Sequence, residues 1–279
     1  MLDGGGSLQH GLLSRLVFDE LPVLTDPAGV FRPDTPVLME GGGRGSIVHT
    51  ADGGINTTCG LIYGADKGEG LDLEGEFVHA LNFGGKDAVR VGDALFTAVQ
   101  DAPGVRMATE AMTGPYYGTM VIGSGNIIQP ETSFVASIHI TMAATSQDDV
   151  NLVDILGTIA YLGTISPASA DKTLTITLPA VAGQPYHLQL LFARGSNCYT
   201  ANRHDVIVDG DPIATDFSYL ALSGGDANRG TQDGSHGVFL RHDMVVRSST
   251  VTVVLDRSAY PPKTSGLWVN GLTLERTSS

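Results

Sequence analysis

Two pairs of neighbouring histidine and aspartate residues are the first candidates for acid–base chemistry in this chain. His204 precedes Asp205 and His242 precedes Asp243, each in a run with the apolar–polar alternation of a β-strand. Because neighbouring side chains on a strand point to opposite faces, neither pair can form a His–Asp hydrogen bond within itself. Nucleophile-elbow, zincin and Walker sequences are also absent. The sequence therefore predicts a protein that is not an enzyme, but leaves open a glycosidase-like carboxylate pair among its 30 acidic residues.

Oxygen-rich turns offer a second kind of chemistry, calcium binding. Asp209-Gly210-Asp211 and the segment 224–234 place several acid and amide side chains in turns, and Ca²⁺ prefers hard oxygen ligands. The same residue types are typical of turns that only need local hydrogen bonds and left-handed backbone. No EF-hand spacing occurs, the histidines are scattered and the two cysteines stand alone. We therefore expect no cofactor and no metal site, with calcium as the open alternative.

The two cysteines, Cys59 and Cys198, lie far apart in the sequence. In an oxidising compartment they could close a long loop as a disulfide. The alternative is two buried thiols, because free cysteine is among the residue types most often buried. A disulfide between them is therefore possible from the sequence.

Short alternating segments dominate the chain and predict its fold. Apolar and polar residues alternate with period two in the segments 76–83, 93–99, 172–178, 186–194, 204–211, 249–255 and 267–276. Turns rich in Gly, Asp, Asn, Ser and Pro separate them. This pattern predicts an all-β protein, an antiparallel β-sandwich of the jelly-roll type. The segment 150–162 is compatible with either a short helix or a buried strand.

The composition agrees with such a fold and argues against several partners. Hydrophobic residues make up 42% and charged residues 16% of the 279 residues, and 36 are glycine, which suits a sizeable core and many turns. The net charge of −14 argues against binding to nucleic acid or to anionic membrane surfaces. No segment reaches the roughly 18 consecutive apolar residues of a membrane helix, so no membrane insertion is expected. No secretion signal is visible at the start of the chain.

The composition also changes near residue 70. Residues 71–279 carry the alternating segments and predict the sandwich. Residues 1–70 are rich in Gly and Pro and hold few apolar residues, which would make a weak independent core. We therefore expect an N-terminal extension that adds strands to the main sheet, with a small β subdomain as the alternative.

Several of these segments, in this order, resemble a known family. They read YHLQLLFAR, RHDVIVDGDPIATDFS, GVFLRHDM, TVTVVLD and LWVNGLTLER, preceded by EFVHALNFGG and VGDALFTA. Over roughly residues 74–276 the chain is similar to the malectin-like, galactose-binding-type β-sandwiches. The similarity is greatest to those of planctomycete-type surface and secreted proteins. The resemblance implies a malectin-like fold and an extracellular or cell-surface location.

The resemblance also implies a carbohydrate site on loops at one edge of the sandwich. Such domains hold sugars with loop aromatics and a carboxylate, because a pyranose has apolar C–H faces and polar hydroxyls. Tyr116 and Tyr117 stand where the family has a loop aromatic pair, although one of them could instead pack at the edge of the core. The family carboxylate before the last strand is missing here or displaced to Asp256. The expected ligand-binding residues are Tyr116, Tyr117, Tyr199, Asn202, Arg203 and Asp256.

Two functions of different classes follow. The first is a non-catalytic, carbohydrate-binding-like module of an extracellular or cell-surface protein, with a glycan as its partner. The second is a structural subunit of a surface assembly or filament, in which other copies of the chain are the partners. In that case residues 1–70 would exchange strands with neighbours, as donated strands do.

Overall fold

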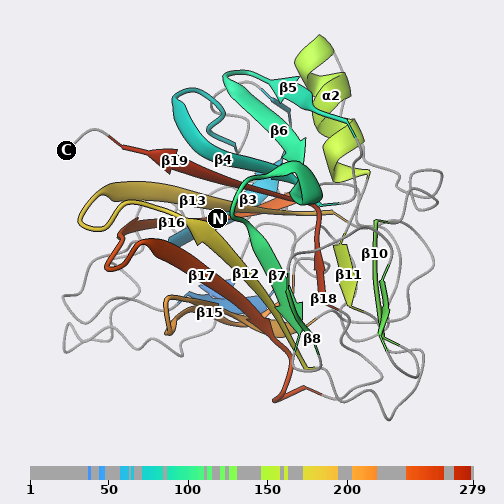
Figure 1. Ribbon diagram of the computed structural model, residues 1–279, viewed down its shortest axis with the longest axis vertical. Coiled ribbons are helices and arrows are strands. Elements are labelled where there is room, and N and C mark those ends of the chain that lie inside the picture. Colours follow the sequence, from blue (N-terminus) through green and yellow to red (C-terminus); the bar gives the residue numbers. More distant parts are fainter. Residues whose placement is uncertain are drawn as a thin grey trace, which may run out of the picture.

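The computed structural model shows, among the residues that it describes, two large β-sheets that face each other and one α-helix outside them (Figure 1). It describes residues 37–38, 44–47, 57–62, 64–65, 71–83, 87–109, 112–114, 120–122, 126–130, 146–157, 160–162, 172–193, 203–218, 237–260 and 267–277.

The first layer is an eight-stranded sheet whose pairs are all antiparallel. From edge to edge its strands are β1 (Val37–Leu38), β2 (Arg44–Ile47), β15 (Asp211–Phe217), β14 (His204–Val208), β17 (Thr250–Asp256), β12 (Thr173–Pro179), β7 (Arg106–Thr109) and β8 (Met112–Gly114). The β12–β17 pair extends from Thr173 opposite Asp256 to Pro179 opposite Thr250. This long regular pair explains why both segments alternate so cleanly in the sequence.

The second layer is a seven-stranded sheet, antiparallel except for the parallel pair β4–β6. Its strands are β3 (Thr57–Ile62), β16 (Gly237–Val245), β13 (Pro185–Phe192), β19 (Gly271–Arg276), β4 (Glu76–Asn82), β6 (Ala94–Ala98) and β5 (Val89–Val91). A smaller sheet holds β18 (Leu267–Val269), β11 (Ala160–Leu162), β10 (Asn126–Pro130) and β9 (Met120–Ile122). A single-turn 3-10 helix, η2 (Val99–Asp101), follows β6. The predicted all-β antiparallel sandwich is confirmed.

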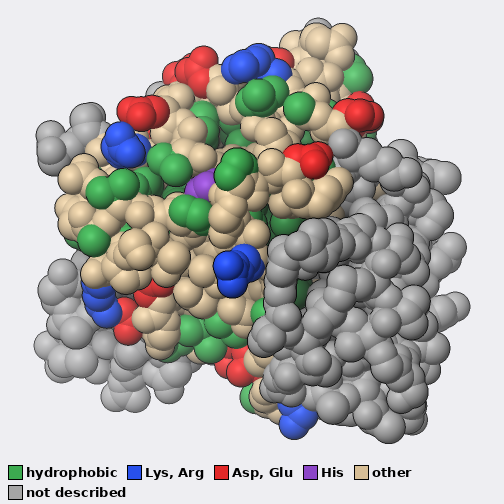
Figure 2. All heavy atoms as spheres, in the orientation of Figure 1, with side chains coloured by type: hydrophobic (Ala, Val, Ile, Leu, Met, Phe, Trp, Pro, Cys, Tyr) green, Lys and Arg blue, Asp and Glu red, His purple; other side chains and the backbone are tan. Residues whose placement is uncertain are grey.

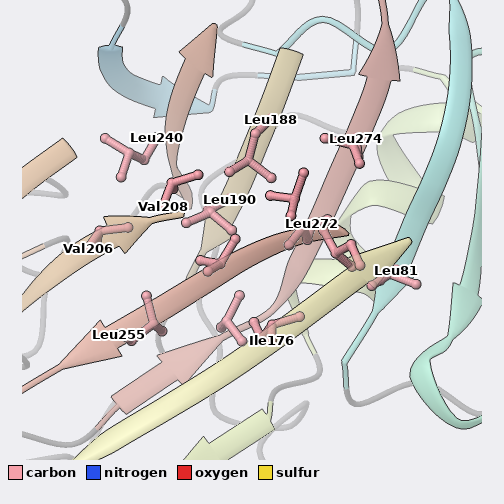
Figure 3. Close-up of a cluster of buried hydrophobic side chains, with 14 of the residues drawn as sticks. Leu81, Ile176, Leu188, Leu190, Val206, Val208, Leu240, Leu255, Leu272 and Leu274 are labelled. Atoms are coloured by element: carbon pink, nitrogen blue, oxygen red, sulfur yellow. The ribbon is translucent and has the colours of Figure 1, made fainter. Parts of the chain in front are cut away.

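Apolar side chains from both large sheets meet in one core (Figure 3). In β12, Leu174, Ile176 and Leu178 are fully buried, whereas the threonines between them are partly exposed. Leu188 and Leu190 of β13 belong to the same cluster from the opposite sheet. Burial of each such side chain stabilises the fold by about 1.5–3 kcal/mol. The core therefore holds the two sheets in a fixed arrangement, and with them the ends of their strands.

The described strands within residues 1–70 join both layers of the sandwich. β2 pairs with β15 at one edge of the eight-stranded sheet. β3 pairs with β16 at one edge of the seven-stranded sheet, from Thr57 opposite His242 to Ile62 opposite Gly237. A domain boundary at residue 70 stays a prediction.

The ambiguous segment 150–162 contains the end of a helix, α2 (Gln147–Leu156), and then the short strand β11. The helix starts with a capping box: the Ser146 hydroxyl accepts the Asp149 N–H, and the Asp149 carboxylate accepts the Ser146 N–H. Leu152 and Ile155 are fully buried in a second apolar cluster, with residues of the seven-stranded sheet. α2 therefore covers part of the outer face of that sheet.

The same helix also protects an edge strand. The Asn151 side-chain amide donates to the carbonyl of Arg90 in β5 at 2.8 Å, and the Asp148 carboxylate accepts the Gly92 N–H at 3.2 Å. Backbone groups of an exposed edge strand otherwise invite pairing with other chains.

No helix in the described part of the chain is long and apolar enough to cross a membrane.

Candidate functional site

Polar side chains gather where β14 begins and where β15 and β17 end. β14 is antiparallel to both of these neighbours, so the three strand ends meet at the same edge of the sheet. Arg203 directly precedes β14, and Tyr260 lies in the turn after β17. We call this group the sheet-end cluster; its members are Arg203, Asp205, Asp216, Asp256 and Tyr260.

A β-bulge aims Asp216 into the sheet-end cluster. Between the flanking residue pairs, β15 has two residues, Thr215 and Asp216, where β14 has only Asp205. Such a bulge turns a side chain out of the regular alternation. Asp216 has a φ of 52°, in the left-handed region where Asp is enriched among non-glycine residues. Its N–H donates to Asp205 Oδ1 at 2.9 Å, which holds this backbone conformation.

Tyr260 joins the two strands through its hydroxyl group. The hydroxyl donates to Asp205 Oδ1 at 2.5 Å and accepts the N–H of Asp216 at 2.8 Å. Burial, followed by the hydrogen bond to Asp205, raises the pKa of Tyr260. The phenol therefore stays protonated at neutral pH and keeps the Asp205 carboxylate in place.

Arg203 completes the arrangement above the Tyr260 ring. Its Nε and Nη2 atoms donate to the two carboxylate oxygens of Asp216 at 2.5 and 2.6 Å, a bidentate pair. Its guanidinium carbon lies 5.2 Å from the centroid of the Tyr260 ring, within cation–π range. The hydrogen bond to Asp216 raises the pKa of Arg203. The side chains of Arg203 and Asp216 remain 39% and 43% exposed, so a solute can reach both.

Asp256 adds a further carboxylate to this edge. It lies directly opposite Asp205 in the β14–β17 register. Like charges in directly opposite positions of paired strands repel each other and destabilise the pair. Its Oδ1 accepts the N–H of Ser258 at 2.7 Å. Three carboxylates and one guanidinium thus meet at one strand end, fixed mainly by backbone and tyrosine hydrogen bonds. Carboxylates are pure acceptors, so the edge is suited to ligands that present hydroxyl or amine donors.

The structure brings together two of the predicted ligand-binding residues, Arg203 and Asp256, at this edge. The others, Tyr116, Tyr117, Tyr199 and Asn202, lie outside the described residues. Sequence reasoning missed the remaining members of the cluster, which are Asp205, Asp216 and Tyr260. Tyr260 carried a usable signal: it stands in the turn before the last strands, where a family carboxylate was expected.

The predicted disulfide is not tested, because Cys198 lies outside the described residues. Cys59 is buried in β3, with a side chain in the main core. Burial raises the pKa of its thiol strongly, which disfavours the reactive thiolate.

The turn residues considered for calcium have protein partners. Asp209 Oδ1 accepts the N–H of Thr252 at 2.8 Å, and the Asp211 carboxylate pairs with Arg247 at 3.0 Å. Asp209 and Gly210 both have positive φ, 51° and 88°, as a tight Asp-Gly hairpin turn requires. Among the described residues, no group of three or more His, Cys, Asp or Glu side chains is placed to hold a metal ion. The segment 224–234 lies outside those residues, and the cofactor expectation stays a prediction.

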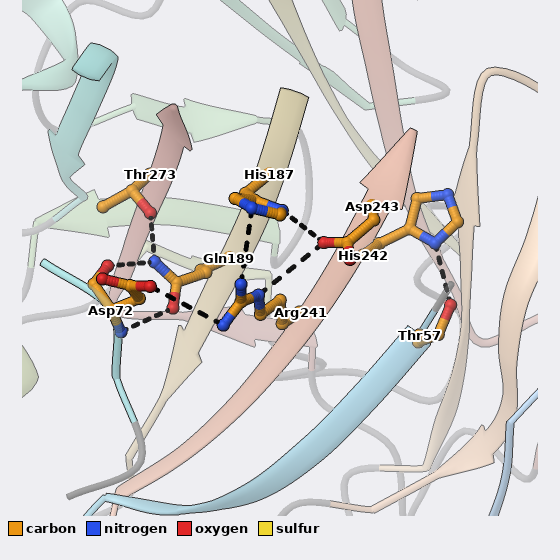
Figure 4. Close-up of polar contacts among 8 residues, drawn as sticks. All are labelled: Thr57, Asp72, His187, Gln189, Arg241, His242, Asp243 and Thr273. Atoms are coloured by element: carbon orange, nitrogen blue, oxygen red, sulfur yellow. Dashed lines mark hydrogen bonds and ion pairs between the residues drawn. The ribbon is translucent and has the colours of Figure 1, made fainter. Parts of the chain in front are cut away.

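His242 and Asp243 point to opposite faces, as the alternation predicts (Figure 4), and in the other pair His204 is buried whereas Asp205 is partly exposed. His242 Nδ1 is 2.8 Å from the Thr57 hydroxyl, whereas Asp243 bonds Nδ1 of His187 on the outer face of the seven-stranded sheet. The other nitrogen of His187 faces the Arg241 guanidinium at 3.4 Å. A catalytic histidine needs a nucleophile or substrate at that position, which the Arg241 guanidinium occupies here. This His187–Asp243 pair therefore does not form a catalytic dyad.

No protein-family model and no curated protein matches the chain. Among solved structures, it is similar to the ANXUR1 extracellular domain from Arabidopsis thaliana, with a TM-score of 0.48 and 16% identity over 73% of this chain and 49% of that one. For the plant receptor-like kinase FER, the TM-score is 0.47 and the identity 14%, over 73% and 50% of the two chains. A structure of the plant peptide RALF23 in complex with FER and LLG2 matches with a TM-score of 0.45 and 15% identity, over 73% and 49%.

The chain thus spans about half the length of the solved chains it matches. The partners in the FER complex belong to FER and are not assigned to this chain. The strand pairing establishes the sandwich here, while the malectin-like assignment and the similarity to planctomycete-type proteins stay predictions.

Proposed function

We propose that this chain is a non-catalytic binding module of an extracellular or cell-surface protein, and that it recognises a hydroxyl-rich glycan at the sheet-end cluster. The observation that carries the proposal is the hydrogen-bonded network of Arg203, Asp205, Asp216 and Tyr260. It is preorganised before any ligand arrives, so binding need not order these side chains.

The chemistry of this network fits a neutral or amino sugar. Sugar hydroxyls can donate to the carboxylates of Asp216 and Asp256 and accept from the Arg203 guanidinium. Three carboxylates against one guanidinium disfavour an anionic sugar. On the face seen in Figure 2, the described Lys and Arg side chains stand singly among acidic and uncharged ones. Nucleic acid would need a clustered basic patch, and the described residues on this face do not form one. The single Lys and Arg side chains are compatible with a glycan partner.

The alternative, a structural subunit that exchanges N-terminal strands with its neighbours, needs strands that can leave their own chain. β2 and β3 pair with β15 and β16 of the same chain. This pairing favours the binding module over the assembly subunit.

Replacing Arg203 by alanine is expected to weaken glycan binding by about tenfold or more, because one hydrogen bond to a charged group contributes about 1.5–3 kcal/mol. The glycan is chosen from an array of neutral, acidic and amino-sugar oligosaccharides, and its affinity is measured by isothermal titration calorimetry. Arg247→Ala is the matched control, since Arg247 also pairs with an aspartate on β15 but is 76% exposed. Equal losses in both variants, or no binding by the wild type to any neutral or amino sugar, would contradict the proposal.

A further inference from the structure

In the described part of the chain, α2 packs on one part of the outer face of the seven-stranded sheet, through Leu152, Ile155 and Leu156. In β13, Tyr186, Leu188 and Leu190 point into the main core, so His187 and Gln189 point outward between them. Gln189 is fully buried: it donates to the Asp72 carbonyl at 2.7 Å and to the Thr273 hydroxyl at 3.0 Å. Figure 4 shows these polar side chains side by side on β13, β16 and β19. They form a hydrogen-bonded polar group on the outer face of the seven-stranded sheet.

An open hollow of about 530 Å³ adjoins this surface. It is lined by Gly75, Glu76, His187, Glu275, Arg276 and Thr277. Gly75 has a φ of 141°, and a Cβ atom there would lie 2.1 Å from Glu275 Oε1. The positive φ favours glycine here, and the missing Cβ atom leaves room for the Glu275 carboxylate beside the chain. The volume is within the range of sites that bind small molecules.

Carboxylates outnumber cations around the hollow. His187 lies directly between Asp243 of β16 and Glu275 of β19 in the strand register. The lining itself holds the Glu76 and Glu275 carboxylates and the Arg276 guanidinium. Asp72, Arg241 and Asp243 lie beside His187 rather than in the lining (Figure 4). In the whole group, four carboxylates thus stand against two guanidinium groups.

The ion pairs that the existing arginines make here are long. Arg276 is 3.4 Å from the Glu76 carboxylate, which is 71% exposed. Arg241 lies 3.9 Å from Asp72 and 3.7 Å from Asp243. The Arg276–Glu76 pair is exposed, and exposed pairs contribute little to stability. An incoming cation can therefore replace Arg276 at Glu76 at small cost.

We propose that this hollow binds a lysine or arginine side chain from a basic peptide segment of a partner protein. Ammonium and guanidinium groups only donate hydrogen bonds, and the Glu76, Glu275 and Asp243 carboxylates only accept them. The net charge of −14 attracts a basic segment to the protein from a distance. The hollow lies on the seven-stranded sheet, whereas the sheet-end cluster lies on the eight-stranded one, so the two proposals are independent.

The test is an NMR titration of ¹⁵N-labelled full-length chain with the capped peptide Gly-Lys-Gly-Lys-Gly, and with a peptide in which glutamate replaces lysine. We expect shifts at residues 75–76, 187 and 275–277 with the lysine peptide only. The double variant Glu76→Gln and Glu275→Gln is expected to weaken binding by about fivefold to tenfold, because it removes two of the accepting charges.

The control variant, Asp101→Asn with Asp154→Asn, removes the same charge at two exposed positions away from the hollow. It is expected to change the affinity by less than about twofold, through screened long-range attraction alone. Glu76→Gln alone, at a position that is 71% exposed, weakens binding in the same direction without risk to the fold. Equal losses in the two double variants, or shifts that spread over the surface without the hollow, would overturn the proposal. Binding of both peptides alike would overturn it as well.

Discussion

Replacing Tyr260 by phenylalanine is expected to lower the affinity for the glycan by about tenfold or more, a free-energy loss of roughly 1.5–3 kcal/mol. The change removes only the hydroxyl that donates to Asp205 and accepts the Asp216 N–H. Without the hydroxyl, nothing offsets the repulsion between Asp205 and Asp256 across the strand pair. The bulge at Asp216 also loses one of the two hydrogen bonds that its N–H donates. Asp216, the ion-pair partner of Arg203, is then no longer held in a fixed position. Calorimetric titration of the purified variant with the array-selected glycan measures the effect.

Tyr186→Phe is the matched control for this prediction. The Tyr186 hydroxyl is buried and accepts the N–H of Val181 at 3.0 Å, far from the sheet-end cluster. Its removal is expected to cost about 1 kcal/mol of stability and to leave the glycan affinity unchanged. Equal affinities for wild type and Tyr260→Phe would show that the network does not support the binding site.

Replacing Leu190 by alanine is expected to lower the free energy of unfolding by about 2–5 kcal/mol. Leu190 is fully buried in the main core and lies between Leu240 and Leu272 in the strand register. The substitution would leave a cavity between the two layers at the centre of the sandwich, because the surrounding strands cannot move together enough to fill it. Urea unfolding followed by circular dichroism measures the change, with an unaltered m-value if both states keep their compactness.

Val181→Ala removes methyl groups from a side chain that is 50% exposed. Its cost is expected to stay within about 0.5 kcal/mol, as for most surface changes. If Leu190→Ala cost no more than Val181→Ala, the main core would not hold the layers together.

The regular strands were predictable from sequence because one face of each is buried. β12 and β17 pair without irregularity, so their apolar residues recur every second position and the pattern is read directly. The segment 150–162 could not be assigned by periodicity, since a short apolar run suits a helix or a strand equally. Ser146 and Asp149 did carry a capping signal, and it would have favoured the helix.

The candidate site was only partly predictable, for a different physical reason. Arg203 and Asp256 stand at the ends of recognisable strands, and antiparallel pairing brings such ends together. Asp216 enters the site through a bulge, which breaks the period-two rule that sequence reasoning depends on. Tyr260 follows β17 and acts through one hydroxyl that reaches the β14–β15 hairpin, 44 and 55 residues earlier in the sequence. No spacing in the sequence encodes such a contact.

The most direct test of the glycan site is a chemical-shift titration of ¹⁵N-labelled protein with the array-selected glycan. We predict that the largest backbone amide shifts fall on residues 203–205, 215–217 and 256–260, and that Arg203→Ala removes them. Saturable shifts confined to other parts of the sandwich, with these residues unmoved, would contradict the assignment of the ligand to the sheet-end cluster.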